Sequence, residues 1–365
     1  MIYVISLLIL VILLPSSYSY KLQRNDIHGG KISQLYSQKA GQDNMKRGGK
    51  VSVVGAGFYG SQVAFRLAQY DIFDTIVLTD IVDGRSEGIA LDINQCSSIE
   101  GFNTDIVGVT TVDDSGYEKT ADSDIVIITA GLPRKPGMSR SDLIGINSKI
   151  IDKVVTNVSK YSPNAILIVV SNPIDEMVAL AQRVSKFSHR KVVGQAGLLD
   201  ASRMSYFVAK KLNVEISKCS TLTLGSHGDA MIPVISRCTV DGRPLSELLN
   251  HDELEEICKR TRDGGAEIVS LLRTGSAFFC PAVSAAKMAR AIMLDTNEII
   301  TCHTYLTGQY GLEDLYIGVE TRLGKDGAIA IESSLNQKEL EQLKSAADIL
   351  KTKQKELDSV FYIIK

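Results

Sequence analysis

The sequence lacks the cysteine and histidine spacing that a zinc site or a disulfide framework requires. None of its six cysteines forms a CxxC pair, and none lies at metal-ligand spacing from one of the five histidines. We therefore expect no metal site, and reduced, mostly buried thiols instead. The six thiols are Cys96, Cys219, Cys238, Cys258, Cys280 and Cys302.

The chain also lacks an excess of positive charge. Its 40 Lys and Arg against 42 Asp and Glu give a formal net charge of −2, with a pI near 6.3. Domains that bind nucleic acid are usually basic. Nucleic acid is therefore not an expected partner.

What the chain does contain is ordinary globular composition. Of its 365 residues, 44% are hydrophobic and 22% are charged, which is close to average usage. That length provides a sizeable core and predicts two domains or one large one.

The first 44 residues differ from the rest and are expected to be a leader. Within residues 1–20, the almost wholly apolar run Ile2–Leu14 is typical of a secretory signal, although no basic segment precedes it. Residues 21–44 carry four Lys or Arg and two Asp among Ser, Gln and Gly, which predicts a disordered basic segment. The two segments together resemble the two-part leaders of proteins sent to secondary plastids. The alternative is a start at Met45, which leaves a cytoplasmic protein.

A glycine-rich turn marks the beginning of the folded body. The β-rich run Lys50–Val54 leads straight into Gly55-Ala56-Gly57-Phe58-Tyr59-Gly60, and a helical stretch follows. A second strand, Thr75–Thr79, then ends in Asp80, twenty residues after the last glycine. This order predicts a dinucleotide site, with the pyrophosphate on the helix N-terminus and the ribose hydroxyls on Asp80. The acid also disfavours the extra phosphate of NADP, so NAD is the expected cofactor.

Further apolar runs predict the rest of the sheet. Asp124–Thr129 and Ala165–Val170 are apolar without alternation, as in parallel strands that are covered on both faces, and a helix is expected over Ser141–Val158. We therefore expect an α/β fold, a doubly wound parallel sheet over residues 45–193 and a mixed α+β substrate domain over residues 194–365.

The second half carries less regular signals. A helix with Asp200 and Arg203 is expected from Gly194–Ser205, a strand from Thr221–Leu224, and a strand pair within Ile299–Val319. The helices expected further along the chain are Ser246–Arg262, Ala266–Asp295 with an interruption at Thr274–Ser276, and Gln337–Tyr362.

Two stretches carry groups suited to catalysis. Ala130–Arg140 is a basic, glycine- and proline-punctuated loop after a buried strand, so it is expected to be mobile. His227 lies in a glycine-flanked turn after another strand, and a carboxylate such as Asp200 would fix its tautomer and raise its basicity. The sequence alone does not bring these two side chains together.

The set of motifs resembles the lactate/malate dehydrogenase superfamily, and within it the lactate-dehydrogenase-like branch of malate dehydrogenases. The motifs are VVGAGFYG, LTDIVDG, ITAGLPRKPGMSR, VVSNPID, GQAGLLDASR and GSHGD, and the resemblance covers Lys50 to the C-terminus. It implies an NAD-dependent 2-hydroxy-acid dehydrogenase of the tricarboxylic acid cycle type, built as a homodimer or homotetramer.

The resemblance also implies roles for single residues. His227 matches the proton donor and acceptor, Asp200 its carboxylate partner, and Arg140 the loop arginine that polarises the carbonyl. Arg203 matches the arginine that binds the substrate carboxylate, where a planar two-pronged donor suits a carboxylate. The remaining matches are Asn172 and Ser276 for substrate, and Asn147, Val170 and Asn172 for cofactor.

Arg134 is expected to decide the substrate. Lactate dehydrogenases of this family generally carry glutamine here and malate dehydrogenases arginine, which would meet the second carboxylate of oxaloacetate. Some parasite lactate enzymes lengthen this loop and place a tryptophan on it, whereas this loop is not lengthened and the chain has no tryptophan. Malate is therefore favoured over lactate. The sequence also leaves open an NAD-binding protein without turnover and an NAD-dependent glycosidase.

Overall fold

The computed structural model describes residues 47–133 and 138–364. The expected leader and Arg134 lie outside these residues, so the predictions made for them remain predictions. No helix in the described ranges is long and apolar enough to cross a membrane.

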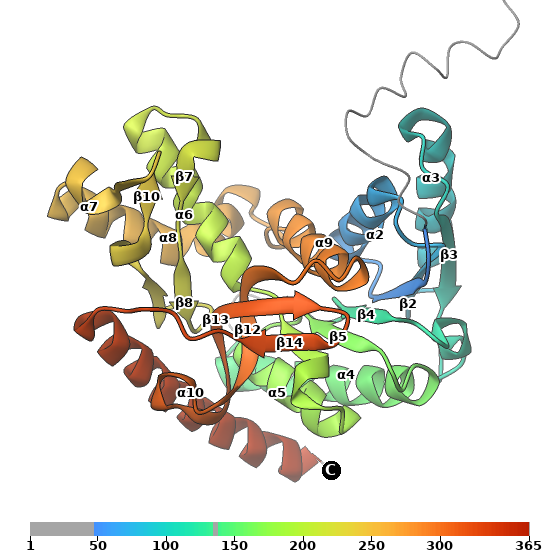
Figure 1. Cartoon of the computed structure of the whole chain (residues 1–365). Coiled ribbons are helices and arrows are strands. Elements are labelled where there is room, and N and C mark those ends of the chain that lie inside the picture. The colour runs from blue at the N-terminus through green and yellow to red at the C-terminus, as the bar shows by residue number, and fades with distance from the viewer. Residues whose placement is uncertain (1–46, 134–137, 365) are drawn as a thin grey trace, which may run out of the picture. The chain divides into compact units, whose positions relative to one another are not determined.

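Six parallel strands form the first half of the central sheet (Figure 1). They are β1 (Lys50–Val54), β2 (Thr75–Asp80), β3 (Asp105–Thr110), β4 (Ile125–Ile128), β5 (Ile166–Val169) and β6 (Val192–Gly194). Their order across the sheet is β3-β2-β1-β4-β5-β6, the order of doubly wound nucleotide-binding sheets. The predicted fold class is confirmed.

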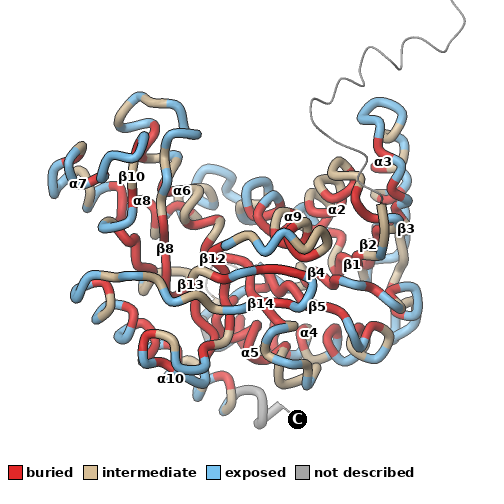
Figure 2. Tube along the Cα trace, in the orientation of Figure 1, coloured by how far each residue is buried: buried red, intermediate tan, exposed pale blue. Residues whose placement is uncertain are grey.

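The central strands of the sheet, β4 and β5 among them, are buried on both faces, as the unbroken apolar runs predicted (Figure 2). In β4, Ile125 and Ile127 pack into one core cluster, and Val126 and Ile128 pack into the cluster on the other face. On the first face lie α2 (Phe58–Tyr70), α3 (Arg85–Glu100) and α9 (Phe279–Met293). On the second face lie α4 (Arg140–Tyr161), α5 (Ile174–Ser185) and α10 (Gln337–Ile364). Strands buried on both faces explain why these runs show no alternation.

Helix α2 follows its apolar periodicity. Val63, Ala64, Leu67 and Ala68 are all fully buried, as their spacing predicted. Full burial of a side chain such as Leu67 stabilises the fold by roughly 1.5–3 kcal/mol. The helix ends at Tyr70 because Asp71 adopts a left-handed conformation, with φ of 51°.

The second half continues the same sheet with antiparallel strands. β12 (Glu298–Thr307) pairs with β6, and β13 (Glu313–Gly324) pairs with β12, β8 and β14. The other strands are β8 (Thr223–Gly225), β9 (Met231–Pro233) and β14 (Gly327–Ala330), and a separate small sheet holds β7 (Cys219–Ser220), β10 (Thr239–Val240) and β11 (Arg243–Pro244). Short 3-10 helices are η1 (Tyr117–Thr120), η2 (His189–Lys191), η3 (Ile216–Lys218), η4 (Ile235–Arg237) and η5 (Gln309–Gly311).

The helices of this half correct one expectation. After α6 (Gly197–Leu212) and α7 (Leu245–Leu248), helix α8 runs from His251 to Leu272 without the expected break near Gly264 and Gly265. A β-carbon at Gly264 would lie 3.2 Å from Cδ of Arg203. The glycines therefore allow α8 to pack closely on α6, and this packing outweighs their weak helix propensity. The interruption comes after Leu272, where Arg273 is left-handed, with φ of 63°.

Candidate functional site

The glycine-rich turn after β1 has the backbone geometry that its glycines permit. Gly55 has a φ of +107°, and a β-carbon there would lie 2.9 Å from the backbone nitrogen of Ala130. A β-carbon on Gly60 would overlap the carbonyl oxygen of Gly55. At Gly57, by contrast, a β-carbon would meet no atom within 4 Å, and no side chain caps α2. The start of α2 therefore has open space beside Gly57 and no side-chain cap on its first amides, at the carboxyl edge of the sheet.

Asp80 ties this turn to the neighbouring strand. It ends β2, and its Oδ2 accepts a hydrogen bond of 2.7 Å from the backbone N–H of Ala56. Its Oδ1 accepts a second bond of 2.9 Å from the N–H of Val82. The carboxylate therefore lies beside the turn, where the sequence predicted it.

Aromatic residues join the turn to α9. Phe58 is 78% exposed and stacks on Phe278 with ring centroids 5.5 Å apart. The hydroxyl of Tyr59 donates to the carbonyl of Pro281 at 2.9 Å. Ser276 lies in the segment just before Phe278 and is exposed. Among the described residues, no hydrogen bond joins Ser276 to His227, so its predicted place in a substrate pocket remains a prediction.

Asn147 connects the segments that follow β4 and β5. It is 1% exposed, and its Oδ1 accepts from the N–H of Leu132 at 2.8 Å. Its Nδ2 donates to the carbonyl of Leu132 at 3.1 Å and to that of Asn172 at 2.6 Å. The Asn172 side chain is exposed at this edge, and Val170 is buried. Asn147 thus braces two backbone segments, and its predicted cofactor contact remains a prediction.

Arg140 is the first residue of α4, and a capping box sets the start of this helix. Oγ of Ser139 accepts from the N–H of Asp142 at 3.1 Å, and Oδ2 of Asp142 accepts from the N–H of Ser139 at 3.0 Å. This reciprocal pair is a capping box, so the helix begins at Arg140. The other loop arginine, Arg134, lies outside the described residues.

Asp200 contacts both His227 and Arg203, the two other residues predicted for the substrate half. Its Oδ2 lies 2.8 Å from Nδ1 of His227, and its Oδ1 lies 3.3 Å from Nη1 of Arg203. The Asp200 side chain is only 2% exposed, against 12% for Arg203 and 21% for His227. Burial lowers the pKa of His227, but the charge and hydrogen bond of Asp200 outweigh it and raise that pKa above its ordinary value.

A second buried carboxylate, which sequence reasoning did not single out, lies behind this cluster. Asp175 accepts hydrogen bonds from Nε2 of His303 at 2.7 Å and from Oγ of Ser226 at 2.6 Å. Asp175 belongs to the motif VVSNPID, which was the available signal. His303 lies in a strand far along the chain, and nothing in its local sequence marks it.

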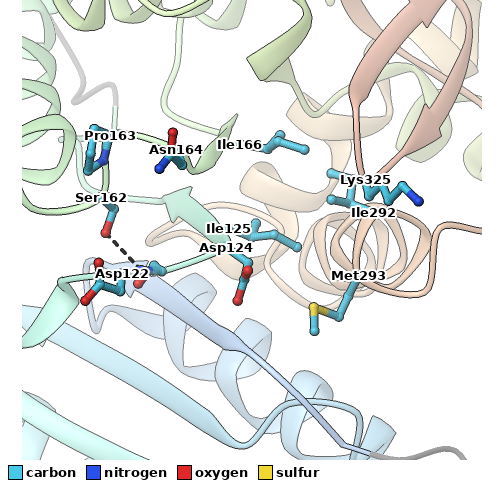
Figure 3. Close-up of a pocket in the computed structure, with 11 residues that line it drawn as sticks. Asp122, Asp124, Ile125, Ser162, Pro163, Asn164, Ile166, Ile292, Met293 and Lys325 are labelled. Atoms are coloured by element: carbon cyan, nitrogen blue, oxygen red, sulfur yellow. Dashed lines mark hydrogen bonds between the residues drawn. The ribbon is translucent and has the colours of Figure 1, made fainter.

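A hollow of about 390 Å³ lies at the opposite edge of the sheet (Figure 3). Asp124 and Ile125 line it at the amino end of β4, and Asn164, Met293 and Lys325 line it from neighbouring segments. Ligands of doubly wound sheets bind beyond the carboxyl ends of the strands. The hollow is therefore separate from the site described above.

The cysteines agree only in part with expectation. All six are free thiols, but only Cys238, Cys258 and Cys302 are buried, and Cys280 is exposed at the start of α9. The expectation of mostly buried thiols is wrong for Cys280 because it lies with Phe279 on the exposed side of the first turn of α9, whose Pro281 and Ala282 are buried. Within the described ranges, no group of three or more His, Cys, Asp or Glu side chains has the arrangement of a metal site.

The fold and the site define a nucleotide-binding α/β protein whose second half supplies a buried carboxylate, histidine and arginine. The chain belongs to the lactate/malate dehydrogenase family. The family profile for the NAD binding domain matches residues 49–194, and that for the alpha/beta C-terminal domain matches residues 198–360.

Similar proteins include both malate dehydrogenases and lactate dehydrogenases. A malate dehydrogenase from Pelodictyon phaeoclathratiforme is 45% identical over 309 residues, which are 84% of this chain and 98% of that protein. The structure of malate dehydrogenase from Salinibacter ruber matches with a TM-score of 0.81 and 39% identity, covering 87% of this chain and all of that one (100%). A lactate dehydrogenase from Cryptosporidium parvum, complexed with lactic acid and NAD, matches with a TM-score of 0.81 and 36% identity, covering 86% and 98%.

Proposed function

We propose that this protein is an NAD-dependent malate dehydrogenase, which interconverts (S)-malate and oxaloacetate. The observation that carries the proposal is the buried carboxylate of Asp200, which binds both the His227 ring and the Arg203 guanidinium. Relatives named malate dehydrogenase support the same activity. Residues 45–193 are assigned to cofactor binding, and residues 194–365 to the substrate.

The glycine-rich turn is suited to a dinucleotide. The open space at Gly57 and the uncapped start of α2 leave room and amide donors for a pyrophosphate. Asp80 lies beside the turn and is suited to ribose hydroxyls. Asn147, Val170 and Asn172 complete the cofactor side of this edge. When bound, NAD supplies the hydride acceptor, and NADH the hydride donor.

His227 is assigned the proton transfer. Because its Nδ1 faces Asp200, Nε2 is the nitrogen that meets substrate. In oxaloacetate reduction, protonated His227 donates a proton from Nε2 to the carbonyl oxygen as hydride reaches the carbonyl carbon. In malate oxidation, neutral His227 accepts the hydroxyl proton at the same nitrogen, and Asp200 stabilises the resulting imidazolium.

Arginines are assigned the two ends of the substrate. Arg203 binds the carboxylate next to the reacting carbon, and Arg140 polarises the carbonyl when the loop closes and excludes water. Asn172 bonds the substrate oxygen, and Ser276 lines the pocket. Arg134 meets the second carboxylate, which separates malate from lactate.

The specificity is tested by Arg134→Gln, with Lys135→Gln as the matched control. A charge pair that loses one partner in a closed pocket costs about 2–5 kcal/mol. The ratio of kcat/KM for oxaloacetate over pyruvate should therefore fall roughly 30-fold to several thousandfold in R134Q, and remain near wild type in K135Q. An unchanged ratio in R134Q would overturn the role of Arg134 in specificity, whereas a wild-type ratio that favours pyruvate would indicate the alternative, an L-lactate dehydrogenase.

The biological setting belongs to the same proposal. We assign a role in the tricarboxylic acid cycle and a homodimeric or homotetrameric state. The signal-like and basic leader would direct the protein to a plastid-type organelle, while a start at Met45 would leave it cytoplasmic. Mass spectrometry of the mature N-terminus distinguishes these two outcomes.

A further inference from the structure

The second buried carboxylate, Asp175, collects donors from three separate parts of the chain. It lies in the first turn of α5, and its side chain is 4% exposed. Its Oδ1 lies 2.7 Å from Nε2 of His303 in β12 and 3.4 Å from the backbone N–H of His227. Its Oδ2 accepts from Oγ of Ser226 at 2.6 Å and lies 3.4 Å from Nζ of Lys353 in α10. Two consecutive residues of the His227 turn are therefore bound to this one side chain.

His303 lies in a row of glycines across the sheet. It pairs with Gly194 of β6 on one side and with Gly318 of β13 on the other, and Gly318 pairs with Gly225 of β8. A β-carbon on Gly194 would lie 2.9 Å from Cβ of His303, and one on Gly318 would lie 3.5 Å from its Cε1. The strand that carries His303 therefore packs closely on β6 at Gly194, and a β-carbon on Gly318 would be at van der Waals distance from the ring.

Packing alone does not account for a histidine at this position. The His303 side chain is 1% exposed, and its Nδ1 has no hydrogen-bond partner among the described residues. A buried polar atom without a partner costs about 1–3 kcal/mol, so the packing of the sheet gives no reason for an imidazole here. What the imidazole provides is a donor that points at Asp175.

The charges around the pair favour an ionised Asp175. Burial alone would raise the pKa of Asp175, but the hydrogen bond and charge of His303, the charge of Lys353 and the Ser226 bond outweigh it and lower that pKa strongly. The negative charge therefore persists at neutral pH. It is available to hold the Ser226 hydroxyl and the His227 amide.

We propose that Asp175, held by His303 and Lys353, is a positioning residue for the catalytic turn. Asp200 orients the His227 ring through its side chain, whereas Asp175 fixes the main chain from which that ring projects. The inference rests on the proposed function, because it takes His227 as the proton-transferring group. It also links α10, through Lys353, to the catalytic turn.

The test compares two replacements of His303 that differ in a single property. His303→Gln keeps an N–H donor that can reach Asp175, whereas His303→Met has similar length and no donor. Cys302→Ala is the control for lost packing. Cys302 is the adjacent residue of β12 and is fully buried, and it packs into the core cluster that contains Ala286 and Ile292. The assay measures kcat and KM for oxaloacetate, the Kd of NADH and Tm for each variant.

We expect kcat of H303M to fall about 10- to 100-fold, as when a catalytic group is displaced by ~1 Å. The Kd of NADH and the KM for oxaloacetate should change by less than about threefold, because neither site is displaced as a whole. H303Q should recover most of kcat, and C302A should lower Tm while kcat stays near that of wild type.

Ser226→Ala keeps the test decisive if H303M does not fold. It removes the 2.6 Å bond to Asp175 without changing the sheet, and it should also lower kcat more than KM. A wild-type kcat in S226A, or in a folded H303M, would overturn the inference while the proposed function stands. A wild-type protein that reduces neither oxaloacetate nor pyruvate would overturn both.

Discussion

Replacing Asp200 by asparagine removes one charge from the centre of the site and keeps the shape of the side chain. In the structure this carboxylate is 2% exposed and binds His227 and Arg203 with different oxygens. The guanidinium of Arg203 can only donate, so the amide oxygen of Asp200→Asn should turn toward it. The amide N–H₂ group then faces Nδ1 of His227, which favours the neutral ring.

The size of the effect follows from the lost bond. A hydrogen bond to a charged group stabilises by about 1.5–3 kcal/mol, and one pKa unit corresponds to about 1.36 kcal/mol. The pKa of His227, which Asp200 raises in the wild type, should therefore fall in D200N. Oxaloacetate reduction near neutral pH should slow roughly 10- to 150-fold.

The assay follows NADH absorbance in both directions across pH. Oxaloacetate reduction needs protonated His227, so its rate is lost as pH rises through the pKa of that ring. In D200N this loss should occur at lower pH. Malate oxidation needs neutral His227 with a free Nε2. In D200N its maximum rate should be strongly reduced, because a ring that accepts the amide N–H at Nδ1 carries its own proton on Nε2.

The matched control is Asp229→Asn, which removes an exposed carboxylate two residues after His227. Its pH profile should coincide with that of the wild type. The reasoning is refuted if D200N keeps the wild-type pH profile in both directions, or if D229N shifts the profile by the same amount.

Two pairs of glycine variants give further predictions. Gly60→Ala should abolish NADH binding and lower Tm, because its β-carbon would overlap a carbonyl of its own turn. Gly57→Ala should weaken NADH binding at unchanged Tm, since its β-carbon meets only open space. Equal losses of Tm in the two variants, measured by calorimetry, would contradict this prediction. Gly264→Ala should raise the KM for oxaloacetate, because a β-carbon 3.2 Å from Cδ of Arg203 displaces that side chain. Gly265→Ala, at 3.6 Å from Arg203, should leave KM unchanged and stabilise α8 by about 0.5–1 kcal/mol in denaturant unfolding; a raised KM in this variant would contradict the steric argument.

Features encoded within a short stretch of sequence were predictable. The run Lys50–Val54 forms β1 with the predicted bounds, and the apolar residues of α2 are buried as their spacing indicated. The contact between His303 and Asp175 was not predictable, because the two residues are 128 positions apart and meet only when β12 joins the sheet. The continuous α8 was missed for a similar reason: local propensity favours a break at Gly264, and packing against Arg203 decides otherwise.

The pairing of β12 with β6 limits how the two halves of such a protein can evolve separately. One sheet runs from β3 through β6 and β12 to β9, so the cofactor half and the substrate half share a single hydrogen-bonded ladder. A chain cut after Gly194 would expose the edge of β6, and exposed edges recruit strands from other molecules. Neither half is therefore expected to fold well when it is fused alone to another protein. A new substrate preference is expected to arise by replacement of side chains and loops while the whole sheet is kept.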